Sequence, residues 1–392
     1  MRLLTVFLFK SLILTALLSC SNNRQANRYT GTTTNERIKF NDPKTGNEVW
    51  QITNDNSVNN VPYFYLQAFT ADDAWVIFKS DRGDGKWRIH RSNMETGEIS
   101  RVSDRVIRSF YSIMPDGKRV AFMSGNALYA VNVATLEEEK IYSFEPTEEE
   151  VARFSAFFSA DGRYTLLSFF NEAADITRLF RVNFVEKTSE LALIFPGRVT
   201  HMLINPRHPH LFVFAHRPRI DMQLNFDLTL DERARYRLFD MNTGTHIPLV
   251  MTEAPLRGSH GSWGADGERF YFYRKYRGRP RSVTIVSVDR RGEDLREYYH
   301  SAALRLGHGT ADPTQRWFIT DSQDRYENPL IKIDLITGES VVLCWPNSSN
   351  APPIRGRCDH VHPVISASGR FVAFTSDNKS RGIPQMFVVP IP

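Results

Sequence analysis

The sequence predicts an all-β protein that forms a single seven-bladed β-propeller, and three observations support this fold. A motif of an apolar or small residue, a polar turn often written A-D-G and a β-rich run occurs seven times. Successive copies lie 44 to 59 residues apart, which is the length of a four-stranded blade with some loop insertions. No long stretch with helical periodicity interrupts them.

The seven copies of the motif begin at Phe69, Ile113, Phe158, Ile204, Trp263, Ala311 and Ile365. A second signal, a strand, a T-G turn and another strand, occurs at 94–104, 241–251 and 335–344, and once more at 42–53, ahead of the first copy. After the seventh copy, the chain has room for only about three strands before Pro392. We therefore expect the N-terminal strand at 47–53 to complete the last blade and close the ring. The widest spacing predicts an insertion near 217–235.

The N-terminus has the pattern of a targeting segment. Arg2 and Lys10 flank an apolar run that ends in Leu17-Leu18-Ser19-Cys20, and a leucine three positions before a cysteine resembles a bacterial lipobox. Cleavage would leave Cys20 as a lipidated N-terminus, whereas an ordinary signal peptide is the alternative. A lipid anchor predicts a lipoprotein on the periplasmic face of the outer membrane or on the cell surface, with no other membrane contact.

The chain divides into three predicted parts. Residues 1–20 would be the signal peptide, the polar stretch 21–38 a flexible tether, and residues 39–392 the propeller domain. The 49 Lys and Arg residues exceed the 44 Asp and Glu, and removing the two cations of the signal peptide leaves a net charge of only +3. Because no clustered basic patch is apparent, nucleic acid is excluded as a partner. The pair Cys344 and Cys358 allows a disulfide without establishing one.

Four histidines precede four copies of the motif by the same three residues: His201, His260, His308 and His362. A repeat places equivalent residues at equivalent positions, so these side chains and His360 should converge on one rim formed by blades 4 to 7. His208, His210 and His216 lack this register, which indicates loop or structural roles. Most of the six tryptophans should belong to the core, with one or two at the channel mouth to stack on a sugar ring.

The spacing of His360 and His362 places both side chains on the same side of one strand. Two imidazoles at that spacing can bind one metal ion, and a third from the next blade would complete a three-nitrogen site with open positions. Histidine ligands of this kind suit manganese, zinc or iron about equally.

These residues carry a resemblance to the oligogalacturonate lyase family, seven-bladed propellers that cleave galacturonate oligomers by β-elimination. The similarity extends from about Phe40 to Pro392 and includes the segments YFYLQAFTADDAWVIFKSD, PDGKRVAFMSGNALYAVNVATLEEEKIY, HMLINPRHPHLFVFAH and HVHPVISASGRFVAFTSD. The resemblance implies a divalent cation, typically manganese, on His308, His360 and His362. It implies that His260 is the catalytic base.

The resemblance also implies a catalytic arginine, which falls on Arg235, with Arg233 and Arg237 as alternatives. A family glutamine that binds the cation is replaced by Arg357, and a guanidinium cannot ligate a metal ion. We therefore expect Arg357, together with His201, to bind substrate. The metal site would then use Asp359 or water in place of the glutamine, or lack a metal altogether.

The sequence thus predicts a lyase acting on an acidic oligosaccharide. Members of the family also have a histidine shortly before the YFY segment, where this chain has Asn60. The identity of the uronate that is cleaved therefore stays open. One alternative is a lyase acting on another uronate glycan such as ulvan. Another is a non-catalytic, TolB-like propeller that binds a glycan or a protein. The sequence leaves the oligomeric state undefined.

Overall fold

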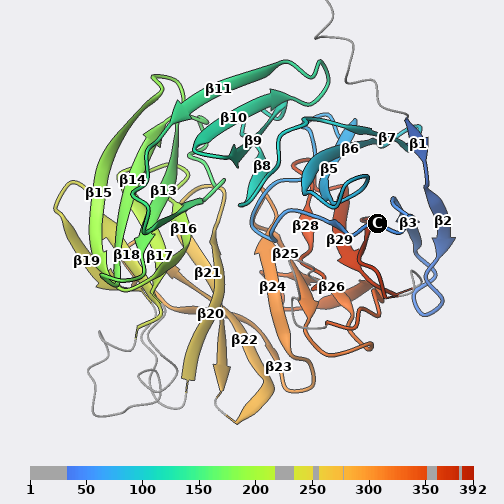
Figure 1. Ribbon diagram of the computed structural model, residues 1–392. Helices are drawn as coiled ribbons and strands as arrows, with labels where there is room; N and C mark the ends of the chain where they lie inside the picture. The colour runs from blue at the N-terminus through green and yellow to red at the C-terminus, as the bar shows by residue number, and fades with distance from the viewer. Residues whose placement is uncertain (1–32, 217–233, 250–255, 277, 351–359, 379–381) are drawn as a thin grey trace, which may run out of the picture.

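The structure, a computed structural model, describes residues 33–216, 234–249, 256–276, 278–350, 360–378 and 382–392. Its strands form seven separate antiparallel sheets that are arranged as blades around a ring (Figure 1). The described residues include no helix, and therefore none that is long and apolar enough to cross a bilayer. The predicted seven-bladed propeller is confirmed.

Blades 2 to 6 each contain four strands in chain order, and the first strand of each lies nearest the channel (Figure 1). Their strands are β8 (Tyr111–Ile113), β9 (Arg119–Ser124), β10 (Ala127–Asn132) and β11 (Glu138–Ser143); β12 (Glu150–Phe154), β13 (Tyr164–Asn171), β14 (Ile176–Asn183) and β15 (Thr188–Pro196); β16 (Val199–Ile204), β17 (Leu211–His216), β18 (Tyr236–Asp240) and β19 (Thr245–Pro248); β20 (Leu256–Trp263), β21 (Arg269–Tyr276), β22 (Arg279–Asp289) and β23 (Arg296–Ser301); β24 (Leu306–Ala311), β25 (Trp317–Ser322), β26 (Leu330–Asp334) and β27 (Ser340–Cys344).

Blades 1 and 7 each contain five strands, because the N-terminal segment adds one or two strands to each of them. Blade 1 comprises β1 (Thr34–Asn35), β4 (Asn59–Asn60), β5 (Trp75–Ser80), β6 (Arg88–Asn93) and β7 (Glu98–Arg101); blade 7 comprises β2 (Ile38–Asn41), β3 (Glu48–Gln51), β28 (Val364–Ile365), β29 (Phe371–Ser376) and β30 (Gln385–Pro390).

The ring is closed by hydrogen bonding between the two ends of the chain. Strand β3 pairs with β30 so that Trp50 faces Val388 and Gln51 faces Phe387, which confirms the predicted closure. Within the stretch 21–38 that the sequence indicates as a tether, residues 34–35 form β1 and Ile38 begins β2. Two such short edge pairings leave no periodic signal in the sequence. Residues 1–32, including Cys20, lie outside the described residues.

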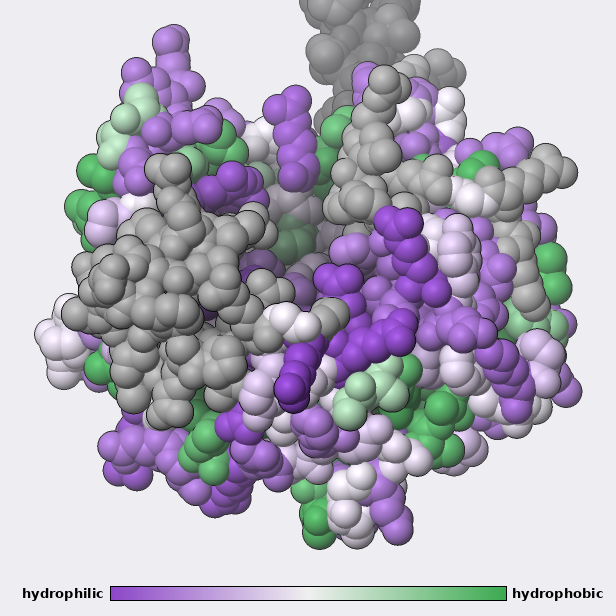
Figure 2. Space-filling model, turned by 90° about the horizontal axis from the view of Figure 1, so that it is seen from below, coloured by the Kyte–Doolittle hydropathy of each residue, from purple (hydrophilic) through white to green (hydrophobic). Residues whose placement is uncertain are grey.

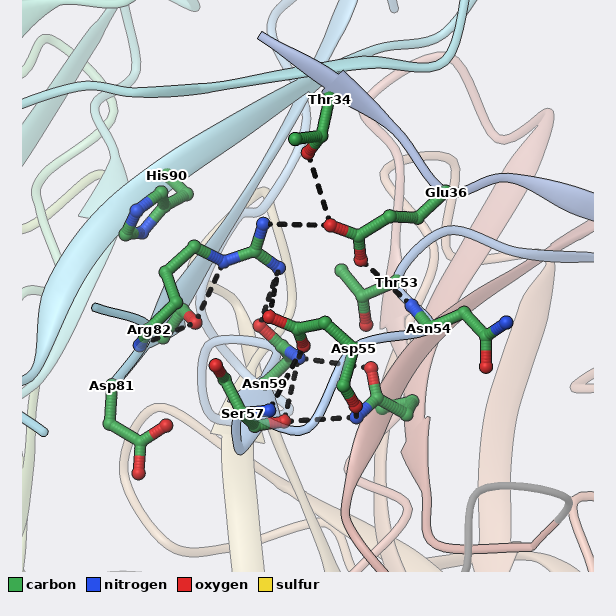
Figure 3. A network of polar contacts seen from close by, with 12 residues as sticks. Thr34, Glu36, Thr53, Asn54, Asp55, Ser57, Asn59, Asp81, Arg82 and His90 are labelled. Carbon is green, nitrogen blue, oxygen red and sulfur yellow. Dashed lines mark hydrogen bonds and ion pairs between the residues drawn. The ribbon is translucent and has the colours of Figure 1, made fainter. Parts of the chain in front are cut away.

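A polar network holds this closure point together (Figure 3). The Arg82 guanidinium donates to Glu36 Oε1 at 3.0 Å and to Asn59 Oδ1 at 3.1 Å. Asn59 in turn donates to Gln385 Oε1 at 2.9 Å, so the network reaches the last strand, β30. The Glu36 carboxylate also accepts the backbone N–H of Asn54 at 2.9 Å. These contacts join segments that are more than 300 residues apart in sequence.

The repeated turn has the same backbone conformation in most blades. Six of the seven motif copies place a residue with positive φ four positions after their first residue: Asp73, Gly117, Gly162, Gly267, Gln315 and Gly369. At Gly117, a Cβ would lie 2.3 Å from Ala71 Cβ in the turn of the preceding blade. Glycine is therefore required there both for the left-handed conformation and for the close approach of the two turns.

Buried hydrophobic side chains fill the spaces between neighbouring blades. One cluster, for example, combines Leu166 and Leu179 of blade 3 with Phe212 and Phe214 of blade 4. The alternation along each strand places apolar residues on both faces, because each blade packs against a neighbour on either side. Figure 2 shows one side of the molecule on which hydrophilic residues predominate and hydrophobic ones occur in small groups.

Candidate active site

The histidines that share a register lie at equivalent irregularities in blades 4 to 7. His201, His260 and His308 occur where the pairing register of β16, β20 and β24 shifts, and His362 immediately precedes β28. A register shift of this kind turns a side chain away from the face of the sheet to which regular alternation would assign it. The predicted common rim is therefore present, although His360 and His362 lie in an irregular segment and not in a strand.

Three of these histidines adopt a left-handed backbone conformation that is uncommon for residues with a Cβ. The φ angles are 48° for His201, 38° for His260 and 45° for His362. His308 lies between Gly307 and Gly309, where a Cβ would come within 2.2 Å and 2.3 Å of neighbouring atoms, respectively. Strained or glycine-dependent backbone at four equivalent positions is typical of residues that a site requires.

His308, His360 and His362 form a compact group of nitrogen donors. One ring nitrogen from each lies within 4.8 Å of the others. The ring centroids of His308 and His362 are 4.2 Å apart, and that of His360 lies 5.5 Å from both. The predicted metal ligands therefore converge, although Asp359 and Arg357 lie outside the described residues.

Asp321 at the end of β25 fixes the orientation of His308. Its carboxylate accepts the His308 backbone N–H at 2.7 Å and the Nδ1–H at 2.9 Å. The backbone of His362 also donates to this carboxylate. A carboxylate on Nδ1 leaves the Nε2 lone pair of His308 for a metal ion, which is the usual support of a histidine ligand. This donor set fits a divalent cation.

Burial keeps the cluster uncharged. Loss of hydration lowers the pKa of His260, His308 and His362 well below the usual imidazole value, and it also lowers the pKa of His360. For His260, a proton on His308 and the charges of Lys275 and Arg235 would act in the same direction. Neutral imidazoles at pH 7 are the form that binds metal or accepts a proton.

His260 has the surroundings of a general base. Its ring centroid is 4.5 Å from that of His308. Its Nδ1 lies 3.1 Å from Ser259 Oγ, and a proton donated by Nδ1 to this hydroxyl leaves the lone pair on Nε2. His201 repeats this arrangement with Thr200 at 3.0 Å, but its Nε2 contacts the Tyr63 hydroxyl at 3.2 Å.

Arg235, just before β18, is the arginine whose charge acts on His260. Its charge contributes to the low pKa of His260, and its Nε is buried without a hydrogen-bond partner among the described residues. Arg237 instead reaches His246 at 3.3 Å and packs 5.7 Å from the Phe195 ring centroid. Arg233 lies outside the described residues.

A cavity of about 550 Å³ adjoins the histidines on the other half of the rim. It is lined by parts of blades 1 to 4: Tyr63, Lys79, Trp87, Ile107, Arg108, Ser109, Phe110, Val151, Ala152, Arg153, Phe154, Ser155, Thr200, His201 and Met202. Phe110 and Ser155 occupy the position of blades 2 and 3 that holds a histidine in blades 4 to 7. Among the described lining residues there are three cations and no carboxylate, so the cavity suits an anionic ligand.

Several residues of the site carried no repeat signal in the sequence. Asp321, Tyr63 and Lys275 each act on at least one of the histidines, and Lys79 and Gln323 also lie beside them. Lys275, only 6% exposed, could have been noticed as a lysine within an aromatic strand. Trp87 at the cavity fits the expected tryptophan at the channel mouth, whereas Trp263 is buried. Cys344 is buried, and Cys358 lies outside the described residues.

Solved structures of other proteins have a similar fold. An oligogalacturonate lyase in complex with manganese has a TM-score of 0.79 and 19% identity, covering 92% of this chain and 98% of the other. An oligogalacturonate lyase from Vibrio parahaemolyticus has a TM-score of 0.77 and 18% identity over the same shares. The β-propeller domain of the Trilobed protease from Pyrococcus furiosus, described as having an open velcro topology, has a TM-score of 0.54 and 14% identity, covering 85% and 95%.

No protein-family model and no curated protein matches the sequence. The structural match to the two lyases nevertheless covers nearly the whole chain. In its fold, the protein therefore resembles oligogalacturonate lyases, as the segments of its sequence predicted.

Proposed function

We propose that the protein is a lyase that cleaves uronate-containing oligosaccharides by β-elimination. The observation that carries this proposal is a neutral histidine, His260, whose ring centroid lies 4.5 Å from that of His308 in the three-imidazole group and whose pKa the charge of Arg235 helps to lower. The cationic cavity beside them supports an acidic substrate. The two lyases of similar fold support the same reaction class.

In the proposed reaction, His260 Nε2 removes the proton at C5 of the uronate. The electrons of the C5–H bond become the C4=C5 double bond, and the C4–O bond breaks with its electron pair on the leaving oxygen. That oxygen takes up a proton, which His260 can return to it, and no water is added to the sugar. Arg235 binds the carboxylate next to C5, where it stabilises the negative charge that develops as the proton leaves.

His308, His360 and His362 would hold a divalent cation, and manganese is our first candidate because one lyase of similar fold contains it. When bound, the cation would supply additional positive charge for the same carboxylate. Asp321 holds His308 in the tautomer required for this. Zinc and iron remain compatible with three imidazole donors.

The experiment that tests the proposal is incubation of the purified protein with galacturonate oligomers while the ultraviolet absorbance of the unsaturated product is recorded. His260→Ala should lower turnover by about 10²–10⁴-fold without changing the metal content. His210→Ala is the matched control, because His210 lies off the rim and should leave turnover unchanged. Absence of product from every uronate oligomer, including ulvan fragments, would leave a glycan- or protein-binding propeller as the function.

The proposal extends to Arg357, His201 and Cys20. His201 lines the cavity and would contact substrate there, and Arg357 would bind a uronate carboxylate. Lipidation of Cys20 would anchor the protein to a bacterial membrane on the periplasmic face or at the surface. Labelling with a radioactive fatty acid checks this, because Cys20→Ser should abolish the label.

A further inference from the structure

The three-histidine cluster lies beside an amide side chain. Gln323, in the connection after β25, places its Nε2 3.3 Å from His308 Nε2. His308 uses Nδ1 for Asp321, so Nε2 is the nitrogen that faces the cluster. Gln323 therefore lies at the donor atom itself and not behind the imidazole.

This separation has the size expected for two ligands of one ion. Two donor atoms that each lie about 2.1 Å from a metal are about 3.0–3.4 Å apart when the angle between the bonds is about 90–109°. The 3.3 Å contact between Gln323 and His308 falls within this interval. A Gln side chain carries a carbonyl oxygen and an NH₂ group at nearly the same position, and a rotation of the amide exchanges them.

The backbone is shaped to admit this side chain. At Gly307, a Cβ would lie 2.2 Å from the Cγ and Cδ atoms of Gln323, so only glycine lets the side chain pass. The backbone N–H of Gln323 donates to Arg305 O at 2.7 Å, which anchors the residue beside the strand that carries His308. Two independent features of blade 6, the space left by Gly307 and the backbone hydrogen bond of Gln323, therefore fix the position of the amide.

From these contacts we propose that the side-chain carbonyl of Gln323 is the fourth protein ligand of the cation held by His308, His360 and His362. Without the ion, the Gln323 amide N–H donates to the His308 lone pair. With the ion bound, that lone pair goes to the metal, and the amide turns to present its oxygen. The inference rests on the metal site of the proposed function, but it concerns cation binding and not lyase chemistry.

The test is a titration of chelator-treated protein with Mn²⁺ alone, followed by calorimetry and by the electron paramagnetic resonance signal of unbound Mn²⁺. Gln323→Leu should weaken binding by at least about tenfold, because it removes the oxygen and keeps much of the volume. Gln323→Glu should retain binding, because it returns an oxygen donor. Gly307→Ala should weaken binding because it displaces Gln323, and combining it with Gln323→Leu should add little.

Gln315→Leu is the matched control, since it removes an amide from a turn of the same blade and should leave Mn²⁺ affinity unchanged. Thermal unfolding of the metal-free variants shows whether each one folds. Wild-type affinity in folded Gln323→Leu would overturn the proposal while leaving the histidine site intact. Absence of Mn²⁺ binding by the wild type would overturn both this proposal and the metal site, whereas Mn²⁺ binding without uronate cleavage would refute only the lyase function.

Discussion

Left-handed backbone at His201, His260 and His362 is costly, because each such residue stores on the order of 1–3 kcal/mol of strain. The surrounding structure must hold these conformations in place, and for His201 and His260 it does so through the strand pairing on either side of each residue. Strain that recurs at equivalent positions of different blades is difficult to attribute to packing alone. At the residue scale, this recurring strain indicates that the rim is a functional part of the molecule.

The support of His308 by Asp321 leads to the first prediction. Asp321→Asn should lower the affinity for Mn²⁺ by about 10–100-fold, because an amide neither fixes the tautomer of His308 nor raises its basicity as a carboxylate does. Calorimetric titration with Mn²⁺ measures the effect. Asp312→Asn, which alters a buried carboxylate in the turn of the same blade, is the control. Equal Mn²⁺ affinity in wild type and Asp321→Asn would show that the carboxylate only stabilises the fold.

His90 predicts a pH dependence of stability. It is 3% exposed, and burial, helped by the charge of Arg82, lowers its pKa to about 3. Below its usual pKa of about 6.5, the unfolded chain binds a proton that the folded protein excludes. Its contribution to stability is therefore complete above pH 6.5 and is lost progressively as the pH falls toward 3.

Between about pH 7.5 and about pH 5, this one group should cost the wild type about 2 kcal/mol of unfolding free energy. His90→Gln should remove that part of the loss, although burying the amide lowers stability at every pH. Denaturant unfolding of both proteins at the two pH values gives the comparison. Identical pH dependence in the two proteins would mean that His90 is protonated in the folded state.

At the scale of elements, the pairing of β3 with β30 predicts how truncation affects stability. A chain starting at residue 33 should unfold at the same temperature as the longer protein. One starting at residue 54 should unfold several degrees lower, because it loses β1 to β3 and the burial of Val49 and Ile52, each worth about 1.5–3 kcal/mol. Differential scanning calorimetry measures both.

A chain starting at residue 42 separates the two parts of the closure. It lacks β1, β2 and the Glu36 contact with Arg82, but it keeps β3 on the last blade. Its unfolding temperature should lie between those of the other two truncations. If all three unfold together, the pairing of β3 contributes no net stability, and the ring is held by contacts between blades alone.

The elements that sequence analysis predicted correctly are those that the repeat defines. Seven turns, the closing strand and the histidine rim follow because a repeat gives equivalent positions in space. Asp321, Lys275 and Gln323 were missed because each occurs in only one blade, and no periodicity distinguishes a functional polar residue from a structural one. The expected strand at His360 and His362 was wrong, because alternation cannot reveal where pairing stops.

At the scale of the whole molecule, the rim divides into a histidine half and a cavity half. Blades 4 to 7 supply imidazoles, whereas blades 1 to 3 supply Lys79, Arg108 and Arg153 around the cavity. A substrate bound across both halves would place its reacting sugar at His260 and a further acidic sugar in the cavity. The arrangement predicts that oligomer length and charge affect binding more than they affect the chemical step.

This division gives a prediction for the double variant Arg108→Gln, Arg153→Gln. Its KM for a galacturonate trimer should rise by about 10²-fold or more, since two hydrogen bonds to charged groups are each worth about 1.5–3 kcal/mol, while kcat should change little. Steady-state kinetics on trimer and dimer give the result. Arg290→Gln, on the outer surface near blade 4, is the control. A fall in kcat with an unchanged KM would place these arginines in the chemistry.

Ring closure also has a consequence for biosynthesis. Gln51 leaves the ribosome 336 residues before its partner Phe387, so β3 must wait for roughly 20–70 s at about 5–20 residues per second. Throughout that interval, the nascent protein carries an unpaired strand and, on blade 7, no sheet to receive it. The strand therefore stays available for pairing with other chains until β30 has been made, and the ring can close only after that.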